Sequence, residues 1–280
     1  MRADANACPA GSATRNVDKA GSLYAIGQNF NLMKCYANSV GNCSSKFSRE
    51  HIISDSLLKS KVGVSGFDWC KGKEVFIGKG SFTQKILCTT HNSALSPFDS
   101  EMTRLFKILK VYDDQSKIKT GIIGYKEEII QGELLERWVL KTSINLIHYY
   151  SRDEKVDFQE NTVIPYLFGD KLFQFPFGLS ITFSTKMKAD FEGKTHFQIG
   201  STINEKNRFL DTVILVFNGF IFTFYLPTKT NLDQLDHLKL KCSGKVISEK
   251  GFVNIWHIKG INHGKNKIKI NWKDEISIIK

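Results

Sequence analysis

The sequence lacks the long hydrophobic runs that membrane proteins require. The longest apolar stretch among its 280 residues, 213–226, is shorter than a membrane-spanning helix and is interrupted by Asn218 and Gly219. The N-terminal segment also lacks the apolar centre of a secretory signal. We therefore expect a cytoplasmic protein with no membrane partner.

Proline is scarce, and acidic residues are outnumbered by basic ones. Only 5 prolines stand beside 21 phenylalanines, which favours a strand-rich portion with a well-filled core. Lys and Arg number 39 against 28 Asp and Glu, so the net charge of +11 favours a polyanionic partner such as nucleic acid. A hydrophobic content of 41% excludes disordered and fibrous proteins, and the length permits one large domain or two moderate ones.

Cysteines are few, and their spacing favours metal ligands over disulfides. Without a secretory signal, free thiols or metal ligands are expected. Cys35 and Cys43 form one pair, and Cys88 with His91 forms a second pair of the C-x-x-H type. Two separated pairs of sulfur and nitrogen ligands suit a closed, tetrahedral structural zinc site. Cys70 is a possible substitute ligand, and a set of unrelated buried thiols is the alternative interpretation.

Three residues near these pairs carry the groups that metal-assisted hydrolysis needs. Glu50 and His51 lie between the pairs, and Asn92 directly follows the second pair, so a shared zinc would draw them together. We expect Mg²⁺ or Mn²⁺ on the oxygens of Glu50 and Asn92, and His51 as the general base. The alternatives are an exposed surface acid, a helix cap for the asparagine, and a capping or core histidine.

The order of these residues resembles that of the HNH endonucleases of the His-Me finger superfamily. The resemblance covers residues 32–110 and implies a zinc-bound ββα-metal, treble-clef-like module that hydrolyses DNA phosphodiester bonds. It implies His51 as general base on a strand, Asn92 as the central asparagine at a helix start, and Glu50 as an acidic metal ligand. Asp99 stands near the motif's third position and is a lesser candidate. An RNA-directed nuclease and a non-catalytic zinc-stabilised nucleic-acid-binding module are the alternatives.

Beyond this module, helix patterns give way to strand patterns. Apolar spacing predicts helices over 101–111 and 132–150, and two apolar runs joined by Asn-Gly predict a hairpin within 212–223. Alternating apolar and basic residues predict a strand over 265–273. The expected fold class is therefore α+β, ending in a β-rich domain.

We expect four segments along the chain. They are a leader (1–31), an HNH nuclease domain (32–110), a helical connection (111–155) and a β-rich C-terminal domain (156–280). The last segment has no assigned role, and a regulatory protein or ligand is a possible partner for it.

Two sets of basic residues are candidates for phosphate contacts. Lys267, Lys269 and Lys273 alternate along the expected C-terminal strand, where they would contact a nucleic-acid backbone or protect an edge strand from pairing. Arg137 and Lys141 lie four residues apart on the polar side of the expected 132–150 helix. We expect that side to be a solvated helix face, with a phosphate contact as the alternative.

Overall fold

The structure is a computed structural model of the whole chain. It describes residues 35–58, 60–65, 68–116, 127–150, 160–169, 171–173, 177–183, 197–203, 210–217, 220–226, 255–259 and 265–272. The chain divides after Leu32 into two units, and all described residues belong to the second, Met33–Lys280. The expected leader, 1–31, lies outside the described residues.

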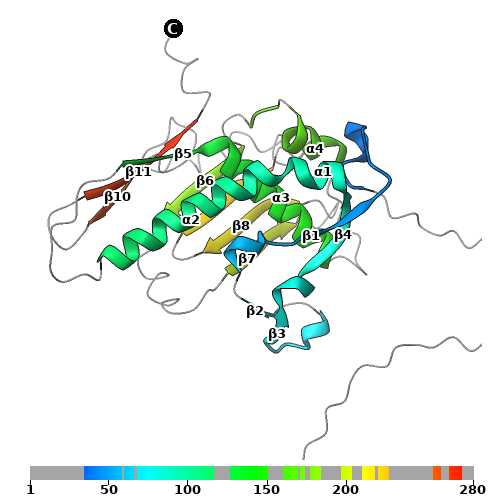
Figure 1. Ribbon diagram of the computed structural model, residues 1–280, viewed down its shortest axis with the longest axis horizontal. Coiled ribbons are helices and arrows are strands. Elements are labelled where there is room, and N and C mark those ends of the chain that lie inside the picture. Colours follow the sequence, from blue (N-terminus) through cyan, green and yellow to red (C-terminus); the bar gives the residue numbers. More distant parts are fainter. Residues whose placement is uncertain are drawn as a thin grey trace, which may run out of the picture. The chain divides into compact units, whose positions relative to one another are not determined.

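The N-terminal part of the second unit is built from short strands and helices. The elements in chain order are η1 (Asn38–Val40), β1 (Phe47–His51), η2 (Asp55–Leu57), β2 (Lys61–Val64), η3 (Asp68–Cys70), β3 (Val75–Gly78), η4 (Lys79–Ser81), β4 (Thr83–Cys88) and α1 (Thr89–Ala94). Strand β1 pairs antiparallel with β4, and β2 pairs antiparallel with β3. Helix α1 packs against both β1 and β4. The β2–β3 hairpin therefore forms an excursion between the two strands of the β1–β4 pair (Figure 1).

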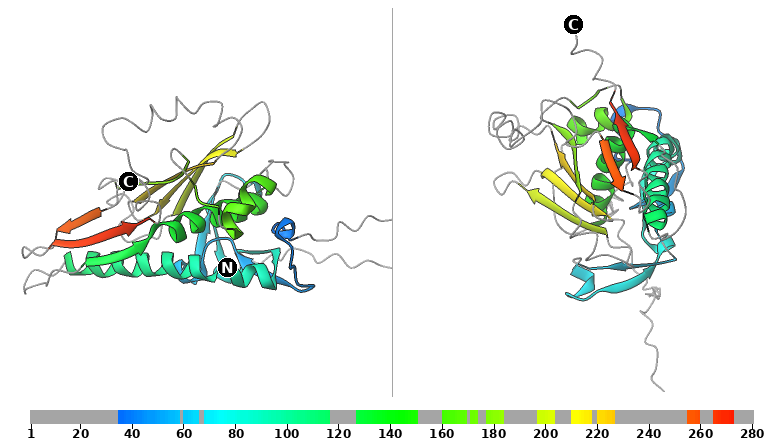
Figure 2. Two further views of the ribbon diagram at one scale, coloured as in Figure 1. Left: turned by 90° about the horizontal axis from the view of Figure 1, so that it is seen from above. Right: turned by 90° about the vertical axis from the view of Figure 1, so that its left-hand side faces the viewer.

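Two long helices follow and pack against each other. Helix α2 (Ser96–Ser116) extends beyond the predicted 101–111 at both ends, whereas α3 (Gly132–Tyr150) confirms the predicted bounds. The predicted solvated face of α3 is wrong, because Lys141 is only 1% exposed. The reason is that α3 contacts α2 and β4 as well as two strands of a C-terminal sheet, β6 (Gly178–Phe183) and β9 (Phe220–Tyr225), so its sides are covered (Figure 2).

The larger C-terminal sheet is antiparallel. Its strands are β6 (Gly178–Phe183), β7 (Phe197–Ile203), β8 (Leu210–Phe217) and β9 (Phe220–Tyr225), in the order β6-β9-β8-β7. The predicted hairpin is confirmed, with Phe217 paired to Phe220 across the Asn-Gly turn. Along β9, alternate phenylalanines are buried, which is the pattern of a sheet with one face on the core. A short helix, α4 (Glu160–Phe168), precedes this sheet.

A second, three-stranded sheet joins segments far apart in the chain. Its strands are β5 (Glu127–Gln131), β10 (Ile255–Lys259) and β11 (Lys265–Asn271), in the order β10-β11-β5. The predicted strand is confirmed as β11, but it pairs on both sides and is parallel to β5. Protection of an edge strand is therefore not the role of its lysines. Lys269 is half-buried, while Lys273 and the side chain of Lys267 lie outside the described part.

The described residues thus form an α+β fold, as the sequence predicts. The segment expected as a helical connection, 111–155, also contains β5, and its helix α3 packs on elements from both halves of the chain. The proposed division of residues 32–280 by function stays a prediction. Within the described ranges, no helix has both the length and the apolar character needed to cross a bilayer.

Candidate metal centre and adjoining site

Four side chains converge on one point, as the cysteine spacing predicts. The ligand atoms of Cys35, Cys43, Cys88 and His91 all lie within 4.8 Å of one another. The Nδ1 atom of His91 lies 3.5, 3.5 and 3.2 Å from the three sulfurs in that order. In a tetrahedral zinc site, bonds of about 2.3 Å to sulfur and 2.0–2.1 Å to nitrogen place those atoms about 3.6 Å apart. The cluster could therefore hold a metal such as zinc.

Strand β4 and helix α1 position two of these ligands. Cys88 ends β4 and caps α1, because its sulfur accepts a hydrogen bond of 3.5 Å from the backbone N–H of His91. The C-x-x-H spacing thus places both side chains on the first turn of one helix.

The other two ligands come from the segment before β1. The N–H of Tyr36 donates to the carbonyl of Ile86 (3.1 Å), which fixes the Cys35 end of this segment against β4. Gly41 and Asn42 have φ values of +83° and +55°, a left-handed turn that a glycine accommodates without strain. This turn brings Cys43 back toward α1. The cluster therefore connects two parts of the chain that are separated by more than forty residues, the segment that ends at Cys43 and the start of α1.

Hydrogen bonds and aromatic rings close the site around the ligands. Ser44 Oγ lies 2.8 Å from Thr89 Oγ1, and the N–H of Thr89 donates to the carbonyl of Lys46 (2.9 Å). The ring of Phe168, at the end of α4, meets the His91 ring edge-on at 5.1 Å. Three of the four ligands are buried and Cys43 is exposed, as expected of a structural site near the surface.

The three thiols of the cluster differ in pKa because their surroundings differ. Burial raises the pKa of Cys35 to about 12 and also raises the pKa of Cys43. Burial acts in the same direction on Cys88, but hydrogen bonds from the His91 N–H and from Ser44 outweigh it and lower its pKa to about 6. Because zinc binds thiolates, the metal would displace protons from the other two thiols.

Cys70 does not belong to this cluster. Its thiol is buried beside β2 and donates to the carbonyl of Val64 at 3.7 Å. The hypothesis that it substitutes for Cys35 or Cys43 is therefore wrong.

His51 ends β1 and is accessible. Its side chain is 33% exposed, and Nε2 lies 3.2 Å from Oδ1 of Asp55. The other carboxylate oxygen of Asp55 pairs with Lys79 Nζ at 2.9 Å. His51 is therefore not a core histidine, and its ring orientation is set by an acid on η2.

The strand register separates His51 from the metal cluster. Phe47 pairs with Cys88 and His51 pairs with Thr83, so His51 lies about 17 Å from Cys88 along β4, at about 3.3 Å per residue. Asn92 follows the ligand His91 on α1, and its Oδ1 is buried with no hydrogen-bond partner among the described residues. The alternative interpretation of Asn92 as a helix cap is wrong, because Cys88 occupies the N-cap position of α1.

Glu50, the neighbour of His51, lies in a buried ion cluster. It is 5% exposed, so the alternative of a surface acid is wrong. Its Oε1 lies 2.6 Å from Lys141 Nζ and accepts a hydrogen bond of 3.1 Å from Asn145 Nδ2. Lys141 also donates to both oxygens of Asp99 at 2.7 Å. Burial raises the pKa of Glu50, and the Lys141 ammonium opposes that rise.

Three side chains of α3 hold β1 and the segment after it. Trp138 Nε1 donates to Ser54 Oγ (2.7 Å), and that hydroxyl donates in turn to Asp99. Asn145 Nδ2 donates to the carbonyl of His51 (3.2 Å) as well as to Glu50. Sequence reasoning missed this role of the three side chains, and Lys141 is wrongly predicted to be solvated or to contact phosphate. Their spacing could have indicated a shared site, because Lys141 and Asn145 follow Trp138 by three and seven residues and therefore lie on one face of the helix.

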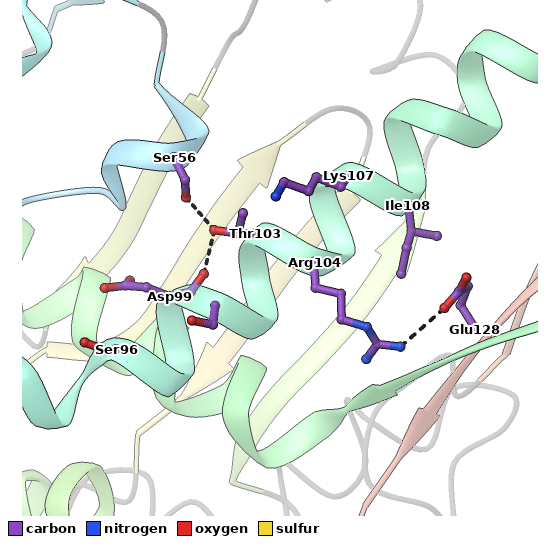
Figure 3. Close-up of a pocket in the computed structure, with 9 residues that line it drawn as sticks. Ser56, Ser96, Asp99, Thr103, Arg104, Lys107, Ile108 and Glu128 are labelled. Carbon is purple, nitrogen blue, oxygen red and sulfur yellow. Dashed lines mark hydrogen bonds and ion pairs between the residues drawn. The ribbon is translucent and has the colours of Figure 1, made fainter.

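An open pocket of about 720 Å³ lies beside the buried ion cluster of Glu50, Lys141 and Asp99 (Figure 3). Its lining residues come from α2, with one residue each from η2 and β5, and all except Ile108 are hydroxyl-bearing or charged: Ser56, Ser96, Asp99, Ser100, Thr103, Arg104, Lys107, Ile108 and Glu128. Arg104 is engaged by Glu128 and the Ile129 carbonyl. Lys107 reaches toward Ser56 and Thr103 and pairs with no acid in the described part of the chain. Because Ser56 follows Asp55, the pocket adjoins the His51 end of β1.

No family model, no curated protein and no solved structure matches this chain.

Proposed function

We propose that residues 32–110 form an HNH-type, metal-dependent endonuclease that hydrolyses DNA phosphodiester bonds. The observation that carries the proposal is the order of elements around the metal cluster. An antiparallel β1–β4 pair leads into α1, His51 ends the first strand, and Asn92 directly follows the metal ligand His91. This is the strand-strand-helix order that the resemblance to HNH enzymes requires.

His51 is the general base in this proposal. Its imidazole is accessible, and Asp55 orients it at 3.2 Å, so the free nitrogen can accept a proton from the attacking water. A divalent ion, Mg²⁺ or Mn²⁺, would supply charge neutralisation at the scissile phosphate and the departing 3′ oxygen. The buried Oδ1 of Asn92, which lacks a partner among the described residues, offers an oxygen ligand of the type that such ions prefer.

Glu50 has a positioning role in this proposal. Its carboxylate is held by Lys141 and Asn145, so it could join a metal-ligand set only by giving up the ion pair with Lys141. The ion pair instead fixes β1 against α3, directly before His51. Glu50 would thus act through His51.

Cys35, Cys43, Cys88 and His91 would hold a zinc ion with a structural role in this proposal. Three thiolates and one imidazole would complete a tetrahedral shell and leave no open position for water or substrate. The zinc would join the segment before β1 to the start of α1, on which Asn92 lies.

The test is cleavage of supercoiled plasmid by the purified full-length protein with Mg²⁺ and with EDTA. We expect nicking that requires Mg²⁺ and falls by about 10²–10⁴-fold in His51→Ala, the typical contribution of a general base. Ser93→Ala, at an exposed position of α1 with no proposed role, is the control and should cleave as the wild type does. Equal cleavage by His51→Ala would refute the catalytic assignment.

Two other functions would both leave the plasmid intact, and an RNA substrate together with a binding measurement distinguishes them. A non-catalytic nucleic-acid-binding module would leave plasmid intact and would bind without a divalent ion, whereas an RNA-directed nuclease would cleave RNA and leave DNA intact. The net charge of +11 suits all three functions. Contacts from Lys267, Lys269 and Lys273 to a nucleic-acid backbone, and a regulatory protein or ligand bound by residues 156–280, remain predictions.

A further inference from the structure

The hairpin between β1 and β4 carries a second set of groups that suit nucleic acid. We call residues 60–79 the arm. It contains β2, η3 and β3, and it extends away from the β1–β4 pair (Figure 1). Its two ends meet where the N–H of Lys79 donates to the carbonyl of Ser60 (3.1 Å).

The arm has an ordered apolar side. Val64 and Cys70 are buried, and the Cys70 thiol donates to the Val64 carbonyl. Val62, Val75 and Ile77 are partly buried and pack against the hydrophobic core to which Val64 and Cys70 belong. The alternation along β2 and β3 therefore directs every second side chain of the arm to the opposite, exposed side.

That exposed side presents an aromatic ring. Phe76 is 66% exposed, more than the other large hydrophobic residues that are exposed in the described part of the chain. It pairs directly with Gly63, and a Cβ on that glycine would meet the Glu74 carboxylate first and Phe76 Cε1 at 3.2 Å. The Glu74 side chain therefore lies over Gly63 beside one edge of the ring, and the rest of the ring is open to solvent.

The arm is also basic. Its sequence contains four lysines against two acids, a net charge of +2. Lys61, on the exposed side with Phe76, is exposed, as are Lys71 and Lys73 in the connection between the strands. None of these three lysines pairs with an acid within the described residues. An open aromatic ring among unpaired lysines is the combination that binds single-stranded nucleic acid, through base stacking and phosphate contacts.

The arm starts and ends beside His51. Lys79, at its base, pairs with Asp55, and the same carboxylate orients the His51 ring. A strand bound along the arm would therefore lead directly to the proposed general base.

We propose that the arm binds an unpaired segment of nucleic acid next to the scissile phosphate, with Phe76 stacked on a base and Lys61 on the backbone. This inference rests on the proposed nuclease function and specifies its substrate class as single-stranded or branched nucleic acid. Stacking requires an unpaired base, so the arm discriminates against continuous duplex.

The test is fluorescence anisotropy with the full-length His51→Ala protein in buffer without Mg²⁺ or Mn²⁺, which prevents cleavage and leaves zinc in the Cys/His cluster. The probes are a short labelled single strand, as DNA and as RNA, and a matched DNA duplex. Adding Phe76→Ala is expected to weaken single-strand binding about 10-fold or more while duplex binding is unchanged. Phe76→Trp is expected to retain single-strand binding, because it keeps a stacking surface.

Two controls separate stacking and charge from general damage. Ile129→Ala removes a comparably exposed apolar side chain, 51% exposed, from β5 and is expected to leave binding unchanged. Lys61→Ala is expected to weaken binding and reduce the slope of log affinity against log salt by about 0.7. Lys110→Ala, on an exposed position of α2, is its matched control.

Three results would overturn the inference. They are single-strand binding that survives Phe76→Ala, equal losses for single strand and duplex, or a dimer in sedimentation that Phe76→Ala dissociates without affecting nucleic-acid binding. If Phe76-dependent binding is present while plasmid, single strand and RNA all remain uncleaved by the wild type, the arm assignment stands and the nuclease proposal fails.

Discussion

Replacing Lys141 by methionine is expected to destabilise the protein more than any surface substitution. The methionine is unbranched and of similar length, so it fills the same space without the charge. Lys141 and the Glu50 carboxylate have side-chain exposures of 1% and 6%, so water cannot replace the lost ammonium at Glu50. Asp99 is 33% exposed and regains part of its hydration.

The magnitude follows from leaving one buried carboxylate without its cation. Breaking a buried ion pair by removing one partner costs about 3–5 kcal/mol, and we expect that loss in the free energy of unfolding. Adding Glu50→Gln to Lys141→Met should recover most of the loss, because an amide needs no counter-charge and its oxygen still accepts from Asn145. Lys110→Met, at an exposed position on α2, should change stability by less than about 0.5 kcal/mol.

The loss should depend on pH. Burial raises the pKa of Glu50 above its ordinary value of 4.5, and Lys141 opposes that rise, so Lys141→Met raises the pKa further. A carboxyl with a higher pKa in the folded state binds its proton more tightly there. The free energy of unfolding therefore falls as the pH rises from 4.5, the ordinary pKa of the carboxyl, through the raised pKa of Glu50.

Urea unfolding near pH 4.5 and near pH 8 measures both effects. The deficit of Lys141→Met should be small at the lower pH and full at the higher pH, and Glu50→Gln should remove this difference. A deficit below about 1 kcal/mol at high pH, or a larger one after adding Glu50→Gln, would refute the reasoning.

Two further predictions concern the metal and the packing of α3. Cys43→Ser should lose bound zinc, measured by elemental analysis of the purified protein, while Cys70→Ser should keep it; equal zinc in both variants would contradict the ligand assignment. Gly132→Ala should lower the free energy of unfolding by about 1–3 kcal/mol although alanine favours helix, because the new Cβ would lie 2.4 Å from the Trp272 ring. Gly80→Ala, with no atom within 4 Å of its Cβ, should be nearly neutral in the same unfolding assay, and equal losses at the two glycines would refute the steric argument.

The Cys88–His91 pair and α3 were predictable because their signals are local. The C-x-x-H spacing places Cys88 and His91 on one turn, and a regular apolar stripe marks α3 from Gly132 to Tyr150. The Asn-Gly turn between two apolar runs likewise predicts the β8–β9 hairpin without knowledge of the rest of the fold.

The burial of charge was not predictable from the same patterns. A helix with polar residues on one side normally exposes them, but α3 lies between α2 and the β6–β9 strands, and Lys141 there meets acids from β1 and α2. Those acids are 91 and 42 residues away in the chain. The parallel pairing of β5 with β11 joins segments that are separated by more than 130 residues, so no local pattern predicts it.

The central claim is that His51 and a divalent ion act together on one phosphodiester bond. The most direct measurement is the initial rate of plasmid nicking as a function of Mg²⁺ concentration, for the wild type and for His51→Ala. We predict a saturable rise for the wild type and a rate lower by at least about 10²-fold at every concentration for the variant. Equal rates for the two proteins, or wild-type cleavage that persists in EDTA, would contradict it.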